Sequence, residues 1–383
     1  MAHWGEHYEI KIPEKSRPGR RVSKPIYATE LGAMYCGLAE KVLKSQPLKC
    51  LHGQAQLVFT SPPFPLNTKK RYGNLQGKQY IKWFASFAPL LKKFLAPNGS
   101  IVIEIGNAWE PGRPVMSTTV LQAFLRFLEK GGLHLCQEFV WYNSARLPSP
   151  IEWVNKERIR VKDAFTRIWW MSPTDRPKAD NRRILREYSP SMKRLIETGK
   201  YNAGLRPAQY YIGEESFKTD NNGAIPPNVG DVDGVPSIDR IVTPKDFAEA
   251  TNLLKAANTG SRDAYREFCV DRGATIHPAR MPKSLVEFFL KFLTDKGDLI
   301  LDPFGGSNTT GAIAEDMGRR WASVEAEWAY AAHSIGRFDP ERIVEVDSDL
   351  SIVEVERKDE VALDDDQATA ASSSSADMPL FTS

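Results

Sequence analysis

The chain has 383 residues, 42% of them hydrophobic and 26% charged, which is the composition of a globular protein with one large core or two smaller ones. Its net charge of +3 hides an asymmetry: residues 345–383 carry 11 acidic and 2 basic side chains, so the rest of the chain has a net charge of +12. A basic body favours a polyanionic partner. No apolar run reaches the length of a membrane span and residues 1–14 lack the apolar region of a secretory signal, so a cytoplasmic protein with no membrane partner is expected.

The first segments of the chain give weak signals. Residues 11–25 carry six basic side chains, one acidic side chain and three prolines. They predict a mobile basic arm, which either follows the phosphates of a nucleic acid or is a solvated leader. The spacing of apolar side chains in residues 29–43 predicts a helix. The four cysteines lack metal-ligand spacing, so reduced thiols and no metal site are expected at Cys36, Cys50, Cys136 and Cys269.

A Ser-Pro-Pro-Phe segment follows the first predicted buried strand. Residues 57–59 are apolar and end that strand, because Pro62 and Pro63 have a fixed φ and no N–H to continue a ladder. The segment therefore lies at the carboxyl end of a strand, where open α/β sheets bind ligands. The Ser61 hydroxyl and the Pro62 carbonyl are acceptors that can hold both N–H groups of a nucleobase amino group, and Phe64 can stack on the base. The same residues also fit a simple turn.

Strands and helices alternate from here to residue 142. Residues 65–74 form a polar, basic loop that is either a lid over the Ser-Pro-Pro-Phe segment or a solvated connection. The apolar spacing then predicts helices over residues 79–95, with Pro89 inside, and 118–130. Strands are expected over 100–105 and 134–142. This βαβ spacing is typical of half of a doubly wound, mostly parallel sheet.

The alternation stops at residue 143 and resumes near residue 277. Residues 141–220 carry 16 basic and 10 acidic side chains among many aromatic ones, a balance that is compatible with a polyanionic partner. Residues 221–236 predict a long loop. The segment His277-Pro278-Ala279-Arg280-Met281-Pro282 precedes a predicted helix over 284–293.

The last regular part contains an acidic residue, a glycine turn and a second acidic residue. A strand over 299–301 ends in Asp302, and residues 303–308 lead through Gly305 and Gly306 into a helix over 309–317. The next strand, 321–325, ends in Glu325, where a carboxylate can accept from both hydroxyls of a ribose. A nicotinamide-binding loop is the rival interpretation, but the G-x-G-x-x-G spacing is missing.

Together, S-P-P-F and D-P-F-G-G-S-N-T-T resemble the motifs of amino-methylating DNA methyltransferases, in the permuted order of the beta class, over residues 26–338. The S-P-P-F form resembles the cytosine-N4 branch. The resemblance implies that S-adenosylmethionine is the cofactor, that double-stranded DNA is the partner, and that the target base is flipped into the Ser-Pro-Pro-Phe pocket. It assigns catalysis to Ser61, Pro62, Pro63 and Phe64. It assigns cofactor binding to Asp302, Pro303, Phe304, Gly305, Gly306, Ser307, Thr309, Glu325, His277 and Pro278.

The expected function is methyl transfer to N4 of cytosine in duplex DNA, by an enzyme of a restriction-modification system. Adenine N6 is the alternative target, since only the resemblance favours cytosine. An RNA amino-methyltransferase and an inactive DNA-binding relative are the remote alternatives. The basic segments predict DNA contacts through Lys69, Lys70, Arg71, Arg158, Arg160, Arg182 and Arg183.

The chain is therefore expected to have four regions: a catalytic half (1–142), a target-recognition insert (143–270), a cofactor-binding half (271–345) and a disordered acidic tail (346–383). The tail ends in Met-Pro-Leu-Phe after Asp377, which loosely resembles the peptides that bind the bacterial sliding clamp. It is either such a docking motif or a tail without a function. A DNA-modifying enzyme of this kind is expected to be nucleoid-associated.

Overall fold

The computed structural model describes residues 4, 8–17, 21–65, 75–142, 146–200, 203–207, 209–213, 215–227, 229–230 and 264–354. Three expected DNA contacts, Lys69, Lys70 and Arg71, lie outside the described residues, as do residues 355–383 with the expected clamp peptide. Within the described ranges, the helices are all too short or too polar to cross a membrane.

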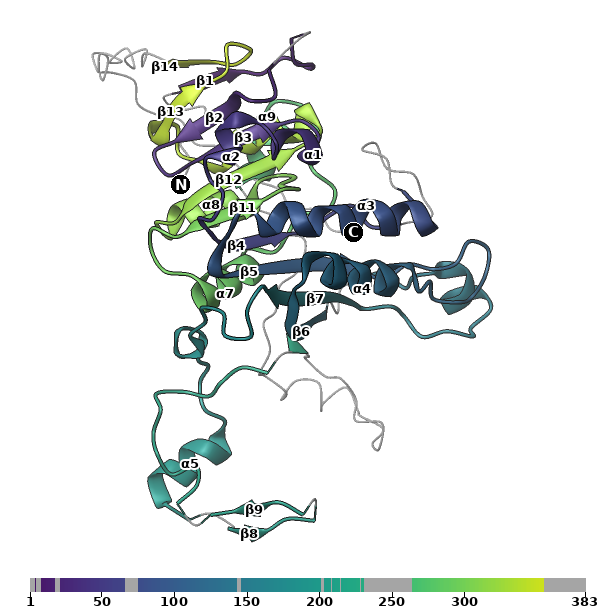
Figure 1. Cartoon of the computed structure of the whole chain (residues 1–383), viewed down its shortest axis with the longest axis vertical. Coiled ribbons are helices and arrows are strands. Elements are labelled where there is room, and N and C mark those ends of the chain that lie inside the picture. Colours follow the sequence, from purple (N-terminus) through teal and green to yellow (C-terminus); the bar gives the residue numbers. More distant parts are fainter. Residues whose placement is uncertain are drawn as a thin grey trace, which may run out of the picture.

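A mixed sheet of ten strands forms the body of the described chain (Figure 1). The strands are, in sheet order, β10 (Val229–Gly230), β6 (His134–Tyr142), β7 (Phe165–Ser172), β5 (Leu95–Gly106), β4 (Ala55–Thr60), β11 (Leu299–Asp302), β12 (Arg320–Glu325), β3 (Gly32–Cys36), β2 (Pro25–Thr29) and β13 (Ile343–Val346). The five central strands, β5 to β3, are parallel to one another. β6, β7, β2 and β13 add antiparallel pairings at the two sides. The expected α/β sheet is confirmed.

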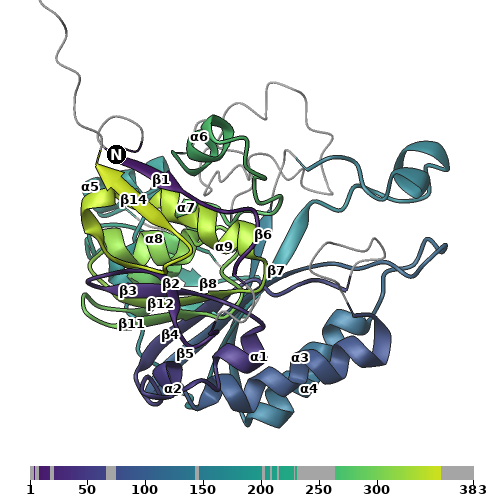
Figure 2. The ribbon, with the colours of Figure 1, turned by 90° about the horizontal axis from the view of Figure 1, so that it is seen from above.

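Helices cover both faces of this sheet (Figure 2). One hydrophobic core lies under α1 (Ala39–Val42), α2 (Gln46–Lys49), α3 (Gly77–Lys92) and α4 (Thr119–Gly131). A second core lies under α6 (Ala264–Asp271), α7 (Lys283–Leu293), α8 (Thr309–Asp316) and α9 (Trp328–His333). Because both faces of the central strands are covered, every residue of β4 is buried. The alternation of apolar strands with amphipathic helices in the sequence therefore explains why helices cover both faces of the sheet.

The central pairing joins the two halves of the chain. β4, which leads into the Ser-Pro-Pro-Phe segment, runs parallel to β11, which leads into the glycine turn. Both motifs consequently stand at the carboxyl ends of neighbouring strands, where a ligand between them can contact both.

The helix expected over residues 29–43 is wrong. The chain instead forms β2, β3 and the short helix α1 there. Gly32 lies so close to β12 that a Cβ at this position would come within 2.3 Å of the Trp321 carbonyl oxygen, and Gly37 has a φ of +150°. Pairing with β12 and these two glycines outweigh the helical spacing of the apolar side chains.

The first part of the expected insert belongs to the sheet, because it forms β7. β7 pairs with both β5 and β6, although it lies beyond residue 143. The chain then passes through η2 (Asn181–Ile184) into a small module of α5 (Pro190–Thr198), β8 (Gly204–Leu205) and β9 (Tyr211–Ile212), which stands apart from the sheet at the bottom of Figure 1. Between β6 and β7 lies the single π-helical turn η1 (Glu152–Lys156).

The two ends of the described chain lie side by side. β1 (Tyr8–Lys11) pairs antiparallel with β14 (Ser351–Glu354), after the short helices η3 (Ser334–Arg337) and η4 (Pro340–Arg342). Arg17, from the expected basic arm, forms an ion pair with Asp349 at 2.9 Å. Regular structure therefore continues eight residues past position 346, where the acidic tail was expected to start, because Leu350 is buried and β14 finds a partner.

Candidate active site

A hydrogen bond joins the carboxyl ends of β4 and β11. Thr60 Oγ1 donates to Asp302 Oδ1 at 2.7 Å, and the Phe304 N–H donates to the same oxygen at 3.1 Å. Burial raises the pKa of Asp302 to about 6, although these hydrogen bonds favour the ionised form. The Ser-Pro-Pro-Phe segment is thus fixed against the glycine turn by one buried carboxyl group.

Ser61 is bonded to a carboxyl group that lies on the next strand. Its Oγ donates to Glu104 Oε2 at 2.5 Å, and Glu104 is only 4% exposed near the end of β5. Burial raises the pKa of Glu104, and the Ser61 hydrogen bond and the charge of Arg146 oppose that rise. Because the hydroxyl proton is directed to Glu104, the lone pairs of Ser61 Oγ remain available as acceptors.

Glu104 was missed in the sequence, although a signal was present. It is the one charged residue in the apolar run Ile101-Val102-Ile103-Glu104-Ile105, and an unpaired carboxylate is rarely found fully buried. A charge in the middle of a strand that is buried on both faces indicates a partner or a function. The partner is Ser61, 43 positions earlier in the chain.

The aromatic side chain of the segment packs against the end of β5. A Cβ on Gly106 would lie 2.7 Å from Cε2 of Phe64, so only glycine leaves room for this ring. Phe64 is half-buried, whereas Pro62 is buried and Pro63 half-buried. The structure thus brings Ser61 and Phe64 together around the ends of β4 and β5, as a base pocket requires.

The glycine turn is held by three sequence features. The Gly305 N–H donates to Val324 O at 2.7 Å, and Gly306 has a φ of +54°, which favours glycine. Asn308 also has a positive φ, and its side chain caps α8 by accepting from the Gly311 N–H at 3.2 Å. The turn therefore presents backbone rather than side chains to a ligand above it.

Glu325 closes the side of this turn. Its Oε2 accepts from the Gly306 N–H at 3.0 Å and its Oε1 accepts from the Glu327 N–H at 2.8 Å. Burial, together with the nearby Asp302 charge, raises the pKa of Glu325 to about 7. A carboxylate has about four acceptor positions, so these backbone hydrogen bonds do not exhaust its capacity to accept from a ligand.

His277 faces the same turn. A Cβ on Gly306 would lie 3.0 Å from His277 Nε2, and the imidazole packs edge-on against Tyr330 with ring centroids 4.5 Å apart. Burial lowers the pKa of His277 to about 4, so the ring is neutral at pH 7. Since Nδ1 accepts from the Ala279 N–H at 3.3 Å, the proton is on Nε2, where it can be donated to a ligand.

Other expected cofactor residues support the turn from behind. Ser307 accepts from Arg337 through its carbonyl at 2.5 Å and through its Oγ at 3.0 Å. The ring of Phe304 packs against Phe87 on α3, with centroids 5.2 Å apart. Pro303 and Thr309 are buried, whereas Pro278 is exposed. Ser307 and Phe304 are thus anchored by protein contacts, which shape the turn.

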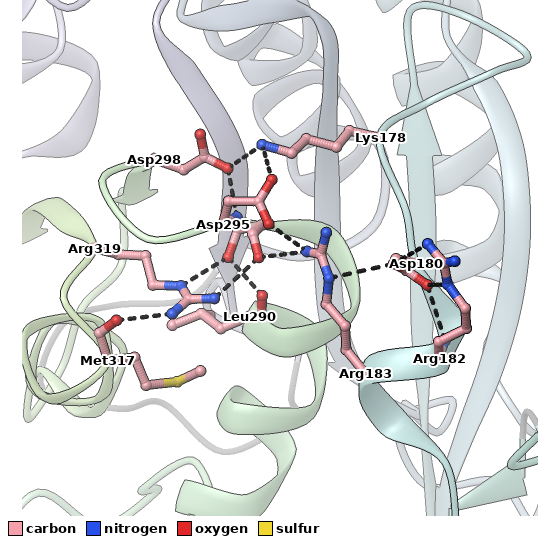
Figure 3. Close-up of polar contacts among 10 residues, drawn as sticks. Lys178, Asp180, Arg182, Arg183, Leu290, Asp295, Asp298, Met317 and Arg319 are labelled. Atoms are coloured by element: carbon pink, nitrogen blue, oxygen red, sulfur yellow. Dashed lines mark hydrogen bonds and ion pairs between the residues drawn. The ribbon is translucent and has the colours of Figure 1, made fainter. Parts of the chain in front are cut away.

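The four described arginines that were expected to contact DNA fall into two places. Arg158 and Arg160 lie in the connection between β6 and β7, on the edge of the sheet that carries Ser61. Arg183 forms an ion pair with Asp295 at 2.8 Å, and Arg182 is paired with Asp180 at 2.8 Å (Figure 3). Asp295 precedes β11, so this network lies at the opposite end of that strand from Asp302.

The charged residues in Figure 3 form ion pairs with one another and hydrogen bonds to the backbone. Lys178 bonds Asp295 at 2.8 Å and Asp298 at 2.6 Å, and Arg319 donates to the carbonyl of Thr294 at 3.0 Å. These contacts fasten the chain that leaves β7 to the turn between α7 and β11. The structure thus separates the two arginine pairs that were expected to act together.

We expect Glu325→Ala to weaken S-adenosylmethionine binding by roughly 1.5–3 kcal/mol, because two charge-assisted hydrogen bonds are lost. The pKa of about 7 adds a pH dependence, since ribose hydroxyls would bind the ionised form of this carboxylate. Affinity should therefore fall about tenfold as the pH drops from 8 to 6, and level off above pH 8. Calorimetry across this range checks both effects.

Glu325→Gln is the matched control, because it keeps the shape and removes the titration. A remaining dependence near pH 6 is expected from Asp302. Unchanged affinity of Glu325→Ala for both S-adenosylmethionine and S-adenosylhomocysteine would show that the carboxylate is structural.

Comparisons with known proteins place this arrangement among DNA methylases. The family model for DNA methylases of the N6/N4 type matches residues 55–335. The type II methyltransferase M.PvuII of Proteus hauseri is 42% identical over 317 residues, which are 82% of this chain and 86% of the relative. M.ScaI of Streptomyces caespitosus is 23% identical over 332 residues, covering 84% and 86%. The solved structure of the cytosine-N4-specific PvuII DNA methyltransferase matches with a TM-score of 0.61 at 37% identity, covering 82% of this chain and 89% of that one.

Proposed function

Because this chain belongs to the N6/N4 family of DNA methylases, we propose that it transfers the methyl group of S-adenosylmethionine to N4 of cytosine in duplex DNA. The observation that carries the proposal is the Ser61–Glu104 hydrogen bond at the end of the strand next to the glycine turn. The cytosine-N4 specificity named for the PvuII enzyme, at 37% identity, supports cytosine over adenine. The same relative supports the modification role in a type II restriction-modification system.

The residues of the pocket prepare the amino group for attack. Ser61 Oγ and the Pro62 carbonyl accept from the two N–H groups of the flipped cytosine, which localises the lone pair of N4. Phe64 covers the face of the base. When bound, S-adenosylmethionine supplies an electrophilic methyl group to that lone pair. The product amino group must then lose one proton.

Glu104 receives that proton through Ser61. N4 gives its proton to Ser61 Oγ as the hydroxyl proton moves to Glu104 Oε2, so the serine ends the step unchanged. A raised pKa makes Glu104 a better base than an exposed carboxylate, which suits this role. No metal or covalent intermediate takes part in this scheme.

The cofactor fits the residues on the other side of the Thr60–Asp302 bond. Gly305 lets the turn pack against Ser323 of β12, and Gly306 leaves room for the His277 ring beside the turn. Glu325 would accept from the ribose, and the neutral His277 would donate its Nε2 proton to the ligand's carboxylate. Asp302 and Glu325 together offset the positive charge of the sulfonium and ammonium groups.

The division into a catalytic half, a recognition insert and a cofactor half stays a proposal. The module of α5, β8 and β9 supports it, because it stands apart from the sheet and exposes Tyr210 and Tyr211. We place sequence recognition there and phosphate contacts on the connection between β6 and β7. In the cell, the enzyme would act in the cytoplasm on the nucleoid, and docking of residues 376–383 on a sliding clamp stays a prediction that a peptide-binding measurement can test.

The two arginine pairs should behave differently in DNA binding. Arg158→Ala with Arg160→Ala is expected to reduce the magnitude of the slope of log K against log salt by about 1, since Arg158 supplies one phosphate contact, which contributes about 0.9, while Arg160 is bonded to the Pro114 carbonyl. Arg182→Ala with Arg183→Ala should leave the slope unchanged and lower the melting temperature, because those side chains hold Asp180 and Asp295. Titration of duplex DNA at several salt concentrations measures the slope. A lowered slope only in the second pair would reverse the assignment.

A further inference from the structure

A cross-braced arm projects beside the catalytic pocket. It consists of residues 146–164, between β6 and β7, and we call it the β6–β7 arm. Its neighbour is the rim loop, residues 107–117, which leaves the end of β5. Figures 1 and 2 both show these two segments, in blue to teal, reaching out together from the strand ends.

Four contacts between the two segments hold the β6–β7 arm in place against the rim loop. Asn107 Nδ2 donates to Asp163 Oδ1 at 3.0 Å at the base of the arm. Further out, the Arg160 guanidinium donates to the Pro114 carbonyl and lies over the ring of Trp109, 5.6 Å from its centroid. The indole of Trp109 packs against that of Trp153, with centroids 6.3 Å apart. Arg160 therefore braces the arm, and Arg158 beside it is exposed.

The base of the arm is next to the reacting groups. Arg146 donates to the Phe165 carbonyl at 2.9 Å and is close enough to Glu104 for its charge to act on that carboxyl group. Asn107 lies three positions beyond Glu104. Side chains at the base of the arm consequently stand beside the pocket that receives the target base.

Two of those side chains are aliphatic and almost fully exposed. Val161 is 89% exposed and Leu147 is 78% exposed, the two highest values among the large hydrophobic side chains of the described residues. They lie on opposite branches of the arm, two residues from Asp163 and one from Arg146. A single exposed aliphatic residue is ordinary, but the two most exposed ones on one braced arm mark a contact surface.

We propose that Leu147 and Val161 form a wedge that contacts the duplex where the target base has left the stack. This proposal rests on the proposed function. Base flipping leaves an apolar gap between neighbouring base pairs, and proteins that deform DNA fill such gaps with aliphatic side chains. The occupant is therefore duplex DNA, and Arg158 supplies charge complementarity to its phosphates.

The test compares two duplexes that carry the enzyme's mapped site. In one the target cytosine is paired with guanine, and in the other it faces an abasic position, which lowers the cost of flipping. Leu147→Ser with Val161→Ser should lower kcat/KM on the paired duplex by on the order of tenfold and recover most of it on the abasic duplex. The salt slope of DNA binding should not change, because no charge is removed.

Leu125→Ser is the matched control, since Leu125 is also an exposed aliphatic residue (62%) but lies on α4. It should match the wild type on both duplexes. An equal loss on both duplexes, no loss on either, or a change in oligomeric state of the double variant would each overturn the wedge. Absence of methyl transfer by the wild-type protein on both duplexes would instead overturn the proposed function.

Discussion

Ser61→Ala should lower kcat by about a hundredfold or more, with little change in the dissociation constant of S-adenosylmethionine. The substitution removes one fixed acceptor of the target amino group, and loss of a single preorganised hydrogen-bonding group of this kind costs about two to three orders of magnitude in turnover. It also cuts the proton path from N4 to Glu104. Single-turnover methylation of duplex DNA, with the cofactor affinity measured in parallel, checks the two halves of this expectation.

The control for this variant is Ser86→Ala. Ser86 is an exposed serine on α3 whose hydroxyl bonds only its own helix, to the Trp83 carbonyl at 2.6 Å. That variant should keep wild-type turnover. If Ser61→Ala also kept it, Ser61 would have no part in the chemistry.

Glu104→Gln should lower kcat by roughly a hundredfold while leaving the protein at least as stable as the wild type. The amide still accepts from Ser61 Oγ but takes up no proton, so general-base assistance is lost. The pKa of Glu104 is raised by burial, so its ionisation disfavours the folded state as the pH rises through the interval between its unfolded and folded pKa values. Removing that ionisation should therefore raise the melting temperature at alkaline pH or leave it unchanged.

A lower kcat together with unchanged or higher stability would distinguish a catalytic role of Glu104 from a structural one. Calorimetric unfolding and single-turnover rates are measured on the same preparations of wild type and Glu104→Gln. Loss of turnover with a marked loss of stability would indicate a structural role for the carboxyl group. Normal turnover would mean that the amino proton leaves by another route.

Five of the ten strands of the sheet, β4, β5, β6, β11 and β12, could be predicted from the sequence, because their signals are local. The helix over 118–130 is observed as Thr119–Gly131, and the strand over 134–142 is observed with the same bounds. The helix prediction for residues 29–43 was wrong because their structure depends on Trp321, nearly 300 residues away. Trp321 packs against Gly32 of β3. A local pattern carries no information about such a partner.

The site residues that belong to a sequence motif could be predicted. The residues that join the site only through a contact between distant parts of the chain could not. Ser61, Asp302 and Glu325 stand at strand ends that the sequence indicates. Glu104 becomes part of the site only through the parallel pairing of β4 with β5. The ion pair of Arg183 could not be predicted for the same reason, because its partner Asp295 lies more than a hundred positions away.

The central claim is methyl transfer to N4 of cytosine in duplex DNA. The most direct measurement is modification-sensitive sequencing of genomic DNA from a host without methylation of its own that expresses this chain, since it returns the base, the atom and the site together. The result we expect is 4-methylcytosine at one defined duplex sequence, absent when Ser61→Ala is expressed instead. N6-methyladenine at such a site, or unmodified DNA with a fully folded protein, would contradict it.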